Sequence, residues 1–203
     1  MSHVRKIVFI AIFGALATVV MSFKFPALFV APGFYKLEFS EIICLIGGYM
    51  LGAPAAIAIE AIKVLLNLLI DGTTTAYVGE FANFLMGCAL VVPATLVFRH
   101  SRTIKSAIVG AVVGVVSLAV VSCLLNAYVL IPMYARLFIK GDMPESDKVA
   151  AIVGAGTAIF PQVKDLSGFV LTCVLLFNLL KGVASAVAGV AVFHLVPKKF
   201  REM

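Results

Sequence analysis

The chain has 203 residues, of which 63% are hydrophobic and only 13% are charged, and its mean hydropathy is +1.14. A soluble globular domain is typically about 45–50% apolar and about 25% charged, so this composition excludes a soluble protein and predicts an integral membrane protein. The net charge of +6 does not indicate binding of nucleic acid, because the basic residues cluster at the ends of the apolar segments.

The apolar segments predict an all-α integral membrane protein in which six transmembrane helices form one compact bundle over residues 1–203. A helix needs about 20 apolar residues to cross the hydrocarbon core of a bilayer. The six helices are expected at approximately 4–22, 39–51, 54–70, 76–98, 104–133 and 167–196. The second and third are short and are separated only by a turn that ends in Pro54, so we expect a hairpin that barely spans the bilayer.

Six helices place both termini on the same side of the membrane, and the cytoplasmic side is the one richer in Lys and Arg. The side of the termini carries eight such residues, namely Arg5, Lys6, Arg99, Arg102, Lys105, Lys198, Lys199 and Arg201. The other side carries six, on longer loops that also hold most of the acidic residues. We therefore expect a multi-pass protein of the cell membrane with both termini in the cytoplasm. The loop that contains KGDMPESDK is expected to be its most soluble segment.

The first helix and the loop after it carry two further patterns. Small residues, among them Ala11 and Ala15, form a stripe on the helix, and such stripes let two backbones pack closely, either inside the protein or against a partner. The loop is rich in Phe, and Pro26, Pro32 and Gly33 prevent a regular helix there. Its aromatic residues predict either a belt at the lipid interface or a lid over a flat ring.

Polar residues recur at helical spacing on three of the predicted helices, and the fifth helix adds one asparagine. These residues are Glu60, Lys63 and Asn67; Glu80, Asn83 and Gly87; Asn178, Lys181 and Ser185; and Asn126. Each set occupies one helix face, which indicates a shared polar interior. The alternative is that they pair only with one another, Glu60 with Lys63 along one helix and Glu80 with Lys181 across the bundle.

Lys181 is the most informative of these residues, because from 167 to 196 the only other basic or acidic residue is His194. A lysine at the centre of a membrane helix costs about 2.5–3.5 kcal/mol on insertion scales. A chain that tolerates this cost usually needs the charge for an ion pair, an ion or a ligand. A structural ion pair and a ligand-binding role are both compatible with the pattern.

Motifs of catalysis are missing from the chain. There is no GxxxxGK[ST] phosphate loop, so ATP is not hydrolysed by that route, and there is no HExxH or GxSxG motif. The four cysteines lie singly in or near apolar segments, which argues against both a metal site and a disulfide framework. The chain is therefore not expected to be an enzyme, to bind a metal or to use a catalytic cofactor.

Six segments in order, YKLEFSEI, IGGYMLG, IEAIKVLLNLLI, VGEFANFLMG, NAYVLIPMYA and FNLLKG, resemble those of the substrate-binding S components of energy-coupling factor (ECF) vitamin transporters. The resemblance covers nearly the whole chain and is strongest to the riboflavin-specific members. It implies that the protein captures riboflavin, as the transported ligand, outside the cell. It also implies association with a transmembrane coupling subunit and two ATPase subunits, which supply the energy.

The resemblance also implies roles for particular residues. Asn126 and Lys181 match positions at the polar edge of the vitamin ring, and the loop around Tyr35 and Leu37 would cover the site. The other residues that we expect at the site are Asn178, Glu80 and Asn83, of which the last two either touch the ligand or only position Lys181. Ala11 and Ala15 match the surface that docks on the coupling subunit. The alternatives are an S component for thiamine, biotin or folate, and a membrane enzyme or scaffold.

Overall fold

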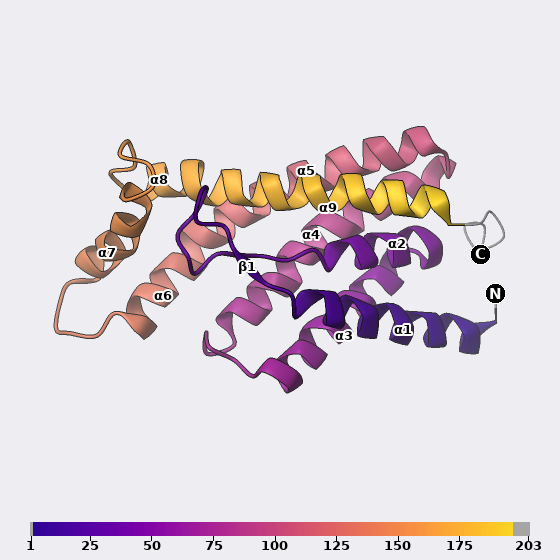
Figure 1. Ribbon diagram of the computed structural model, residues 1–203, viewed down its shortest axis with the longest axis horizontal. Helices are drawn as coiled ribbons and strands as arrows, with labels where there is room; N and C mark the ends of the chain where they lie inside the picture. Colours follow the sequence, from indigo (N-terminus) through magenta and orange to yellow (C-terminus); the bar gives the residue numbers. More distant parts are fainter. Residues whose placement is uncertain (1, 197–203) are drawn as a thin grey trace.

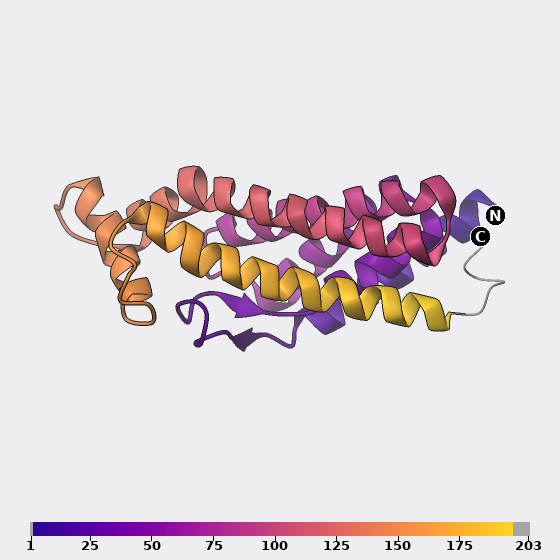
Figure 2. The same cartoon turned by 90° about the horizontal axis from the view of Figure 1, so that it is seen from above.

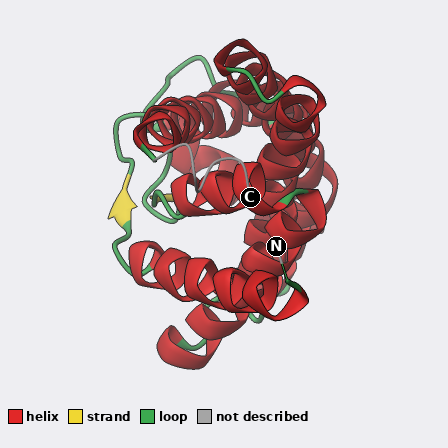
Figure 3. Cartoon of the chain, turned by 90° about the vertical axis from the view of Figure 1, so that its right-hand side faces the viewer, coloured by secondary structure: helices red, strands yellow, loops and turns green. Residues whose placement is uncertain are grey.

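Long helices that run side by side make up most of the computed structural model, which describes residues 2–196 (Figure 1). The helices are α1 (His3–Met21), α2 (Glu41–Leu51), α3 (Ala53–Asp71), α4 (Val78–Ser101), α5 (Ile104–Leu125), α6 (Ile131–Phe138), α7 (Glu145–Thr157), α8 (Leu166–Phe169) and α9 (Leu175–Leu195). Two π-helical turns, η1 (Asn126–Leu130) and η2 (Val170–Val174), join α5 to α6 and α8 to α9. Seen end-on, the long helices pack around one another, with strand structure at the edge (Figure 3).

Five continuous helical stretches within residues 2–196 are long and apolar enough to cross a membrane. They are His3–Met21, Ala53–Asp71, Val78–Ser101, Ile104–Phe138 and Leu166–Leu195. They correspond to five of the six predicted spans. The remaining one, predicted at 39–51, is the 11-residue helix α2. At 1.5 Å per residue it is about 16.5 Å long, little more than half of a hydrocarbon core of about 30 Å.

The turn between α2 and α3 follows the sequence prediction. Gly52 has φ +100° and therefore adopts a conformation that favours glycine, and Pro54 lies in the first turn of α3. The two helices are thus antiparallel neighbours, and the N-terminal end of α2 with Glu41 faces the same half of the bundle as the C-terminal half of α3.

The loop between α1 and α2 is not helical, as its prolines and glycine predicted. Its two-residue strands β1 (Phe25–Pro26) and β2 (Lys36–Leu37) pair antiparallel, Phe25 opposite Leu37. Figure 2 shows this hairpin on the flank of the bundle beside the α8–α9 helix. Beneath it lies an apolar cluster that includes Ala27, Ala31 and Phe169. The hairpin therefore packs onto the protein rather than extending into solvent.

The segment after α6 contains a helix that sequence analysis did not predict. The segment between the predicted spans 104–133 and 167–196, which contains KGDMPESDK, was predicted to be a soluble loop, yet Glu145–Thr157 forms α7. Two acidic residues in its first turn, Glu145 and Asp147, suit the positive end of the helix dipole. Val153 is buried, and Gly156 lies so close to Phe169 that a Cβ would clash with its ring. A single narrow apolar face thus docks α7 on the bundle end.

Candidate ligand-binding site

A cavity of about 240 Å³ lies in the interior between α4, η1, α9 and the hairpin loop. The polar side chains that line it are Lys24, Tyr35, Lys36, Glu38, Glu41, Asn67, Thr74, Thr75, Glu80, Asn83, Asn126, Tyr134, Asn178 and Lys181. Six of the seven predicted ligand-binding residues are therefore brought together at one cavity. The seventh, Leu37, does not line it, because its side chain packs against the apolar cluster beneath the hairpin.

Lys181 lies at the wall of this cavity with 9% of its surface exposed. Its Nζ atom is 2.6 Å from Glu38 Oε1 and 3.2 Å from Glu41 Oε1. The two carboxylates offset the free-energy cost of burying the ammonium group of Lys181. The predicted alternative partner, Glu80, is not one of these. It accepts hydrogen bonds from Thr73 and Thr75 instead, because the start of α4 places it beside the α3–α4 loop.

A second buried lysine extends this network away from the cavity. The Nζ atom of Lys63 is 2.6 Å from Glu60 Oε2 and 3.3 Å from Glu41 Oε1, and all three side chains are almost fully buried. The predicted Glu60–Lys63 pair along one helix is therefore present, but it is part of a larger set. Neither Glu60 nor Lys63 lines the cavity.

The sequence did not predict that Glu38 and Glu41 are the ion-pair partners of Lys181. Both were counted among the acidic residues of the outer side, Glu38 just before and Glu41 at the start of the predicted span 39–51, yet they are 2% exposed. One signal pointed to them: two lysines inside predicted spans need carboxylate partners, and Glu41 lies at the start of the predicted span 39–51. An acidic residue at the edge of an apolar segment, followed by another three residues later, was the place to look for the missing charge.

Two groups of the hairpin loop are held in defined protonation states. Burial alone would raise the pKa of Glu38, but the ammonium groups of Lys181 and Lys63 outweigh it and hold that pKa well below its usual range. Burial raises the pKa of Tyr35 far above its usual range. Glu38 is therefore a carboxylate, and Tyr35 is a neutral phenol that donates to Asn126 Oδ1 at 2.7 Å.

The asparagines are oriented by their own helices. The Nδ2 atoms of Asn126 and Asn178 donate to the carbonyl oxygens of Ser122 and Val174, each at 2.9 Å. The Oδ1 atoms of both side chains are therefore the acceptors that point away from their own helix backbone and can bind other groups. Asn126 begins the π-helical turn η1, and Asn178 lies in α9 one turn after η2 and donates to its last residue, Val174; π-helical turns often occur at functional sites. Asn83 Oδ1 is buried and has no hydrogen-bond partner within residues 2–196, so it can accept from a ligand.

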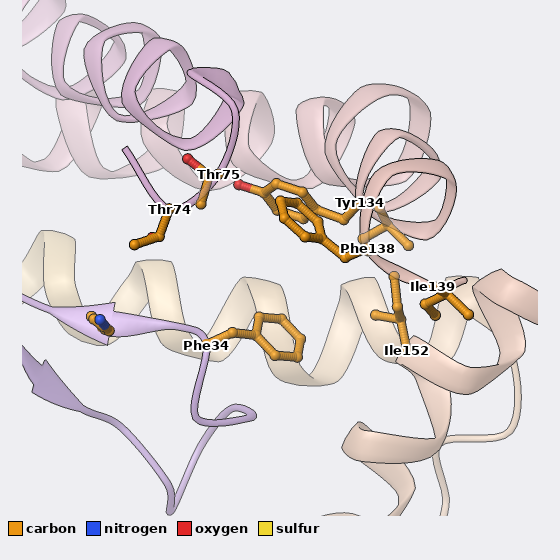
Figure 4. A pocket seen from close by; sticks show the side chains of 9 residues that line it. Phe34, Thr74, Thr75, Tyr134, Phe138, Ile139 and Ile152 are labelled. Atoms are coloured by element: carbon orange, nitrogen blue, oxygen red, sulfur yellow. The ribbon is translucent and has the colours of Figure 1, made fainter. Parts of the chain in front are cut away.

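A second, mostly apolar cavity of about 390 Å³ adjoins the first (Figure 4). The residues that line both are Phe34, Lys36, Thr74, Thr75 and Tyr134. In Figure 4 the rings of Phe34, Tyr134 and Phe138 border the same space. The two cavities together offer a polar end at Lys181 and an apolar end at these rings. Such a combination suits a small ligand that is itself partly apolar.

The small-residue stripe on α1 divides between two environments. A Cβ on Gly14 would clash with Ile62 of α3, and Thr18 Oγ1 donates to the carbonyl oxygen of Lys63 at 3.3 Å. Ala11 and Ala15 are exposed. One part of the stripe therefore makes an internal helix contact, and the other part faces outward.

Comparison with known proteins defines the class. The family model for the ECF transporter substrate-specific component matches residues 5–193, so the chain belongs to this family. The resemblance seen in the sequence is thereby confirmed. With its apolar helices the chain is a multi-pass membrane protein and a transporter component rather than an enzyme.

Curated relatives share a quarter to a third of their residues with this chain. It is 28% identical to the riboflavin transporter RibU of Staphylococcus aureus (strain TCH60), over 96% of this chain and 91% of the relative. It is 31% identical to the riboflavin transporter FmnP of Bacillus subtilis (strain 168), over 84% and 88%. The RibU of Lactococcus lactis subsp. cremoris (strain NZ9000) is also 31% identical, over 100% and 96%.

A solved structure supports the same fold. It is described as the structure and mechanism of the S component of a bacterial ECF transporter, and it superposes with a TM-score of 0.72. The two chains are 26% identical, and the match covers 96% of each.

Proposed function

We propose that this chain is the riboflavin-binding S component of an ECF transporter, which captures the vitamin outside the cell and delivers it inward. The observation that carries the proposal is the joined pair of cavities, one polar around Lys181 and one apolar around Phe34. The curated relatives described above, which match nearly the full chain, are named riboflavin transporters.

The chemistry of riboflavin fits these two cavities. The vitamin has an apolar dimethylbenzene edge, a uracil-like edge with carbonyls and an N–H, and a polyol tail. A lysine ammonium donates to ring carbonyls and nitrogens, and asparagine Oδ1 atoms accept from N–H and hydroxyl groups. We assign Lys181, Asn126, Asn178 and Asn83 to the polar contacts of the ligand. Glu80 shapes the α3–α4 loop, which borders both cavities.

The hairpin loop between α1 and α2 covers the site in this proposal. Tyr35 reaches into the cavity and binds Asn126. Its ring also lies 5.2 Å from that of Phe177 on α9, centroid to centroid. Leu37, which was expected at the ligand, supports the hairpin from below.

We propose six membrane-inserted helices with both termini in the cytoplasm. The short helix α2 with the hairpin takes the place of the second span. The start of α1 and the end of α9 lie at the same end of the molecule, whereas α7 lies at the other (Figure 1). The apolar cavity, lined in part by Ile152 of α7, then opens toward the outside. Of the basic residues counted for this orientation, Lys198, Lys199 and Arg201 lie outside the described residues.

Uphill uptake needs an energy source that the chain does not carry. We propose that it docks through Ala11 and Ala15, which are exposed on α1, on a transmembrane coupling subunit. Two ATPase subunits would complete the complex in the cytoplasmic membrane. Small exposed residues on a membrane helix permit this close approach of a second helix.

Flavin absorbance and fluorescence of the purified chain test the proposal. The protein in mild detergent should quench riboflavin fluorescence on binding and should retain the yellow vitamin after purification. Thiamine, biotin and folate should not compete. If the chain does not bind riboflavin but binds one of those vitamins, it is an S component with a different vitamin specificity. A chain that binds no vitamin favours a scaffold or an enzyme, the second candidate class.

A further inference from the structure

One oxygen atom, Oε1 of Glu41, connects the buried ion pair Glu60–Lys63 of α3 to Lys181 in the cavity wall. Glu41 Oε1 is 3.3 Å from Lys63 Nζ and 3.2 Å from Lys181 Nζ. Lys63 in turn is 2.6 Å from Glu60 Oε2. Two ammonium groups from different helices therefore share one acceptor, and only one of them, Lys181, faces the cavity.

Sharing makes the two contacts competitive. The ammonium group of Lys63 forms ion pairs with both Glu60 and Glu41. The ammonium group of Lys181 forms ion pairs with both Glu41 and Glu38. Charges attract strongly in a buried site where water does not screen them. A change in the electrostatic attraction between Lys63 and Glu41 therefore changes the attraction between Glu41 and Lys181.

We propose that Lys63 and Glu60 are positioning residues for the ligand, because they set how tightly Glu41 holds Lys181. The proposal rests on the proposed function, in which Lys181 binds the vitamin. Neither residue touches the ligand, since neither lines the cavity. Their side chains are fully buried at the interface of α3 with α2 and have no access to solvent.

This mechanism gives substitutions of opposite sign. Without the ammonium group of Lys63, Glu41 has Lys181 as its nearest cation, so it draws Lys181 away from the ligand. Without the charge of Glu60, Lys63 turns fully to Glu41 and leaves Lys181 to Glu38 and the ligand. A residue that only maintains the fold does not produce a gain of affinity on one side and a loss on the other.

The experiment measures the Kd of the full-length chain in detergent for the vitamin that the wild type binds, riboflavin by fluorescence quenching. Lys63→Met should weaken binding about tenfold or more, the size typical when a group that orients a binding side chain is lost. Glu60→Gln should tighten binding about two- to threefold. In a Glu41→Gln background, Lys63→Met should change the Kd less than about twofold, because the route through Glu41 is gone.

A matched control is Thr95→Val, which removes another fully buried polar group, on α4 and away from the cavity, and should leave the Kd unchanged. The inference is overturned if the Lys63→Met effect is equally large without the Glu41 carboxylate, or if Glu60→Gln does not tighten binding. If Lys63→Met does not fold, the sign of the Glu60→Gln effect decides alone. A wild type that binds thiamine and not riboflavin overturns the proposed vitamin, and the same series with thiamine still decides the inference.

Discussion

The pair of Lys181 and Glu38 allows a test that separates stability from binding. Lys181→Met removes the ammonium group and leaves Glu38, with 3% of its side chain exposed, without a paired cation and with the backbone N–H of Ser40 at 2.8 Å as its hydrogen-bond donor within residues 2–196. Breaking a buried ion pair by removing one partner typically costs about 3–5 kcal/mol. Glu41 keeps Lys63, so only one carboxylate is stranded, and we expect a loss of about 3 kcal/mol.

The double variant Lys181→Met/Glu38→Gln should recover most of this stability. A neutral amide replaces the stranded carboxylate and can still accept the Ser40 N–H, and replacing both members of a buried pair is often neutral. Riboflavin binding should be lost in both variants, because the donor to the ring is absent from both.

Thermal unfolding of the purified variants in detergent, with and without riboflavin, measures both quantities. A single variant as stable as the wild type would refute the ion-pair reasoning, as would a double variant less stable than the single one. A single variant that still binds riboflavin with wild-type affinity would refute the assignment of Lys181 to the ligand.

Three further substitutions test other contacts. Gly14→Ala drives a Cβ into Ile62 and should destabilise the fold by about 1–3 kcal/mol in the same unfolding assay; wild-type stability would contradict this close packing of α1 on α3. Ala15→Leu on the exposed side of that helix should keep the stability and the riboflavin Kd but abolish uptake by whole cells, and normal uptake would show that docking occurs elsewhere. Tyr35→Phe removes the donor to Asn126 Oδ1, a hydrogen bond worth about 0.5–1.5 kcal/mol, and should weaken riboflavin binding several-fold; an unchanged Kd would mean that this bond does not hold the loop over the ligand.

The helices and one side of the site follow from local sequence. Apolar length predicted the five long spans, and helical spacing predicted that Asn178 and Lys181 share a face with one another. These properties depend on residues that are close together in the chain, so they can be predicted from the sequence.

The partners of Lys181 depend on contacts between segments far apart in the chain. Glu38 is 143 residues away and belongs to a loop whose path is fixed by packing on α8 and α9. Glu80, which has the spacing of a site residue, is instead held by threonines of its own loop. Spacing therefore predicted which helix faces are polar, but not which charge meets which.

If the cavity binds the vitamin as proposed, the short helix α2 gives that ligand a structural role in the membrane domain. A full span needs about 20 residues, so the 11 residues of α2 leave about nine missing, two and a half turns of helix. The cavity is lined by Glu41, the residue at which α2 begins. In the proposed function, the bound vitamin fills space beside α2 that a full-length span would occupy, and the empty protein has a cavity there. Under this proposal, binding of the vitamin adds packing contacts to the bundle, and its release removes them.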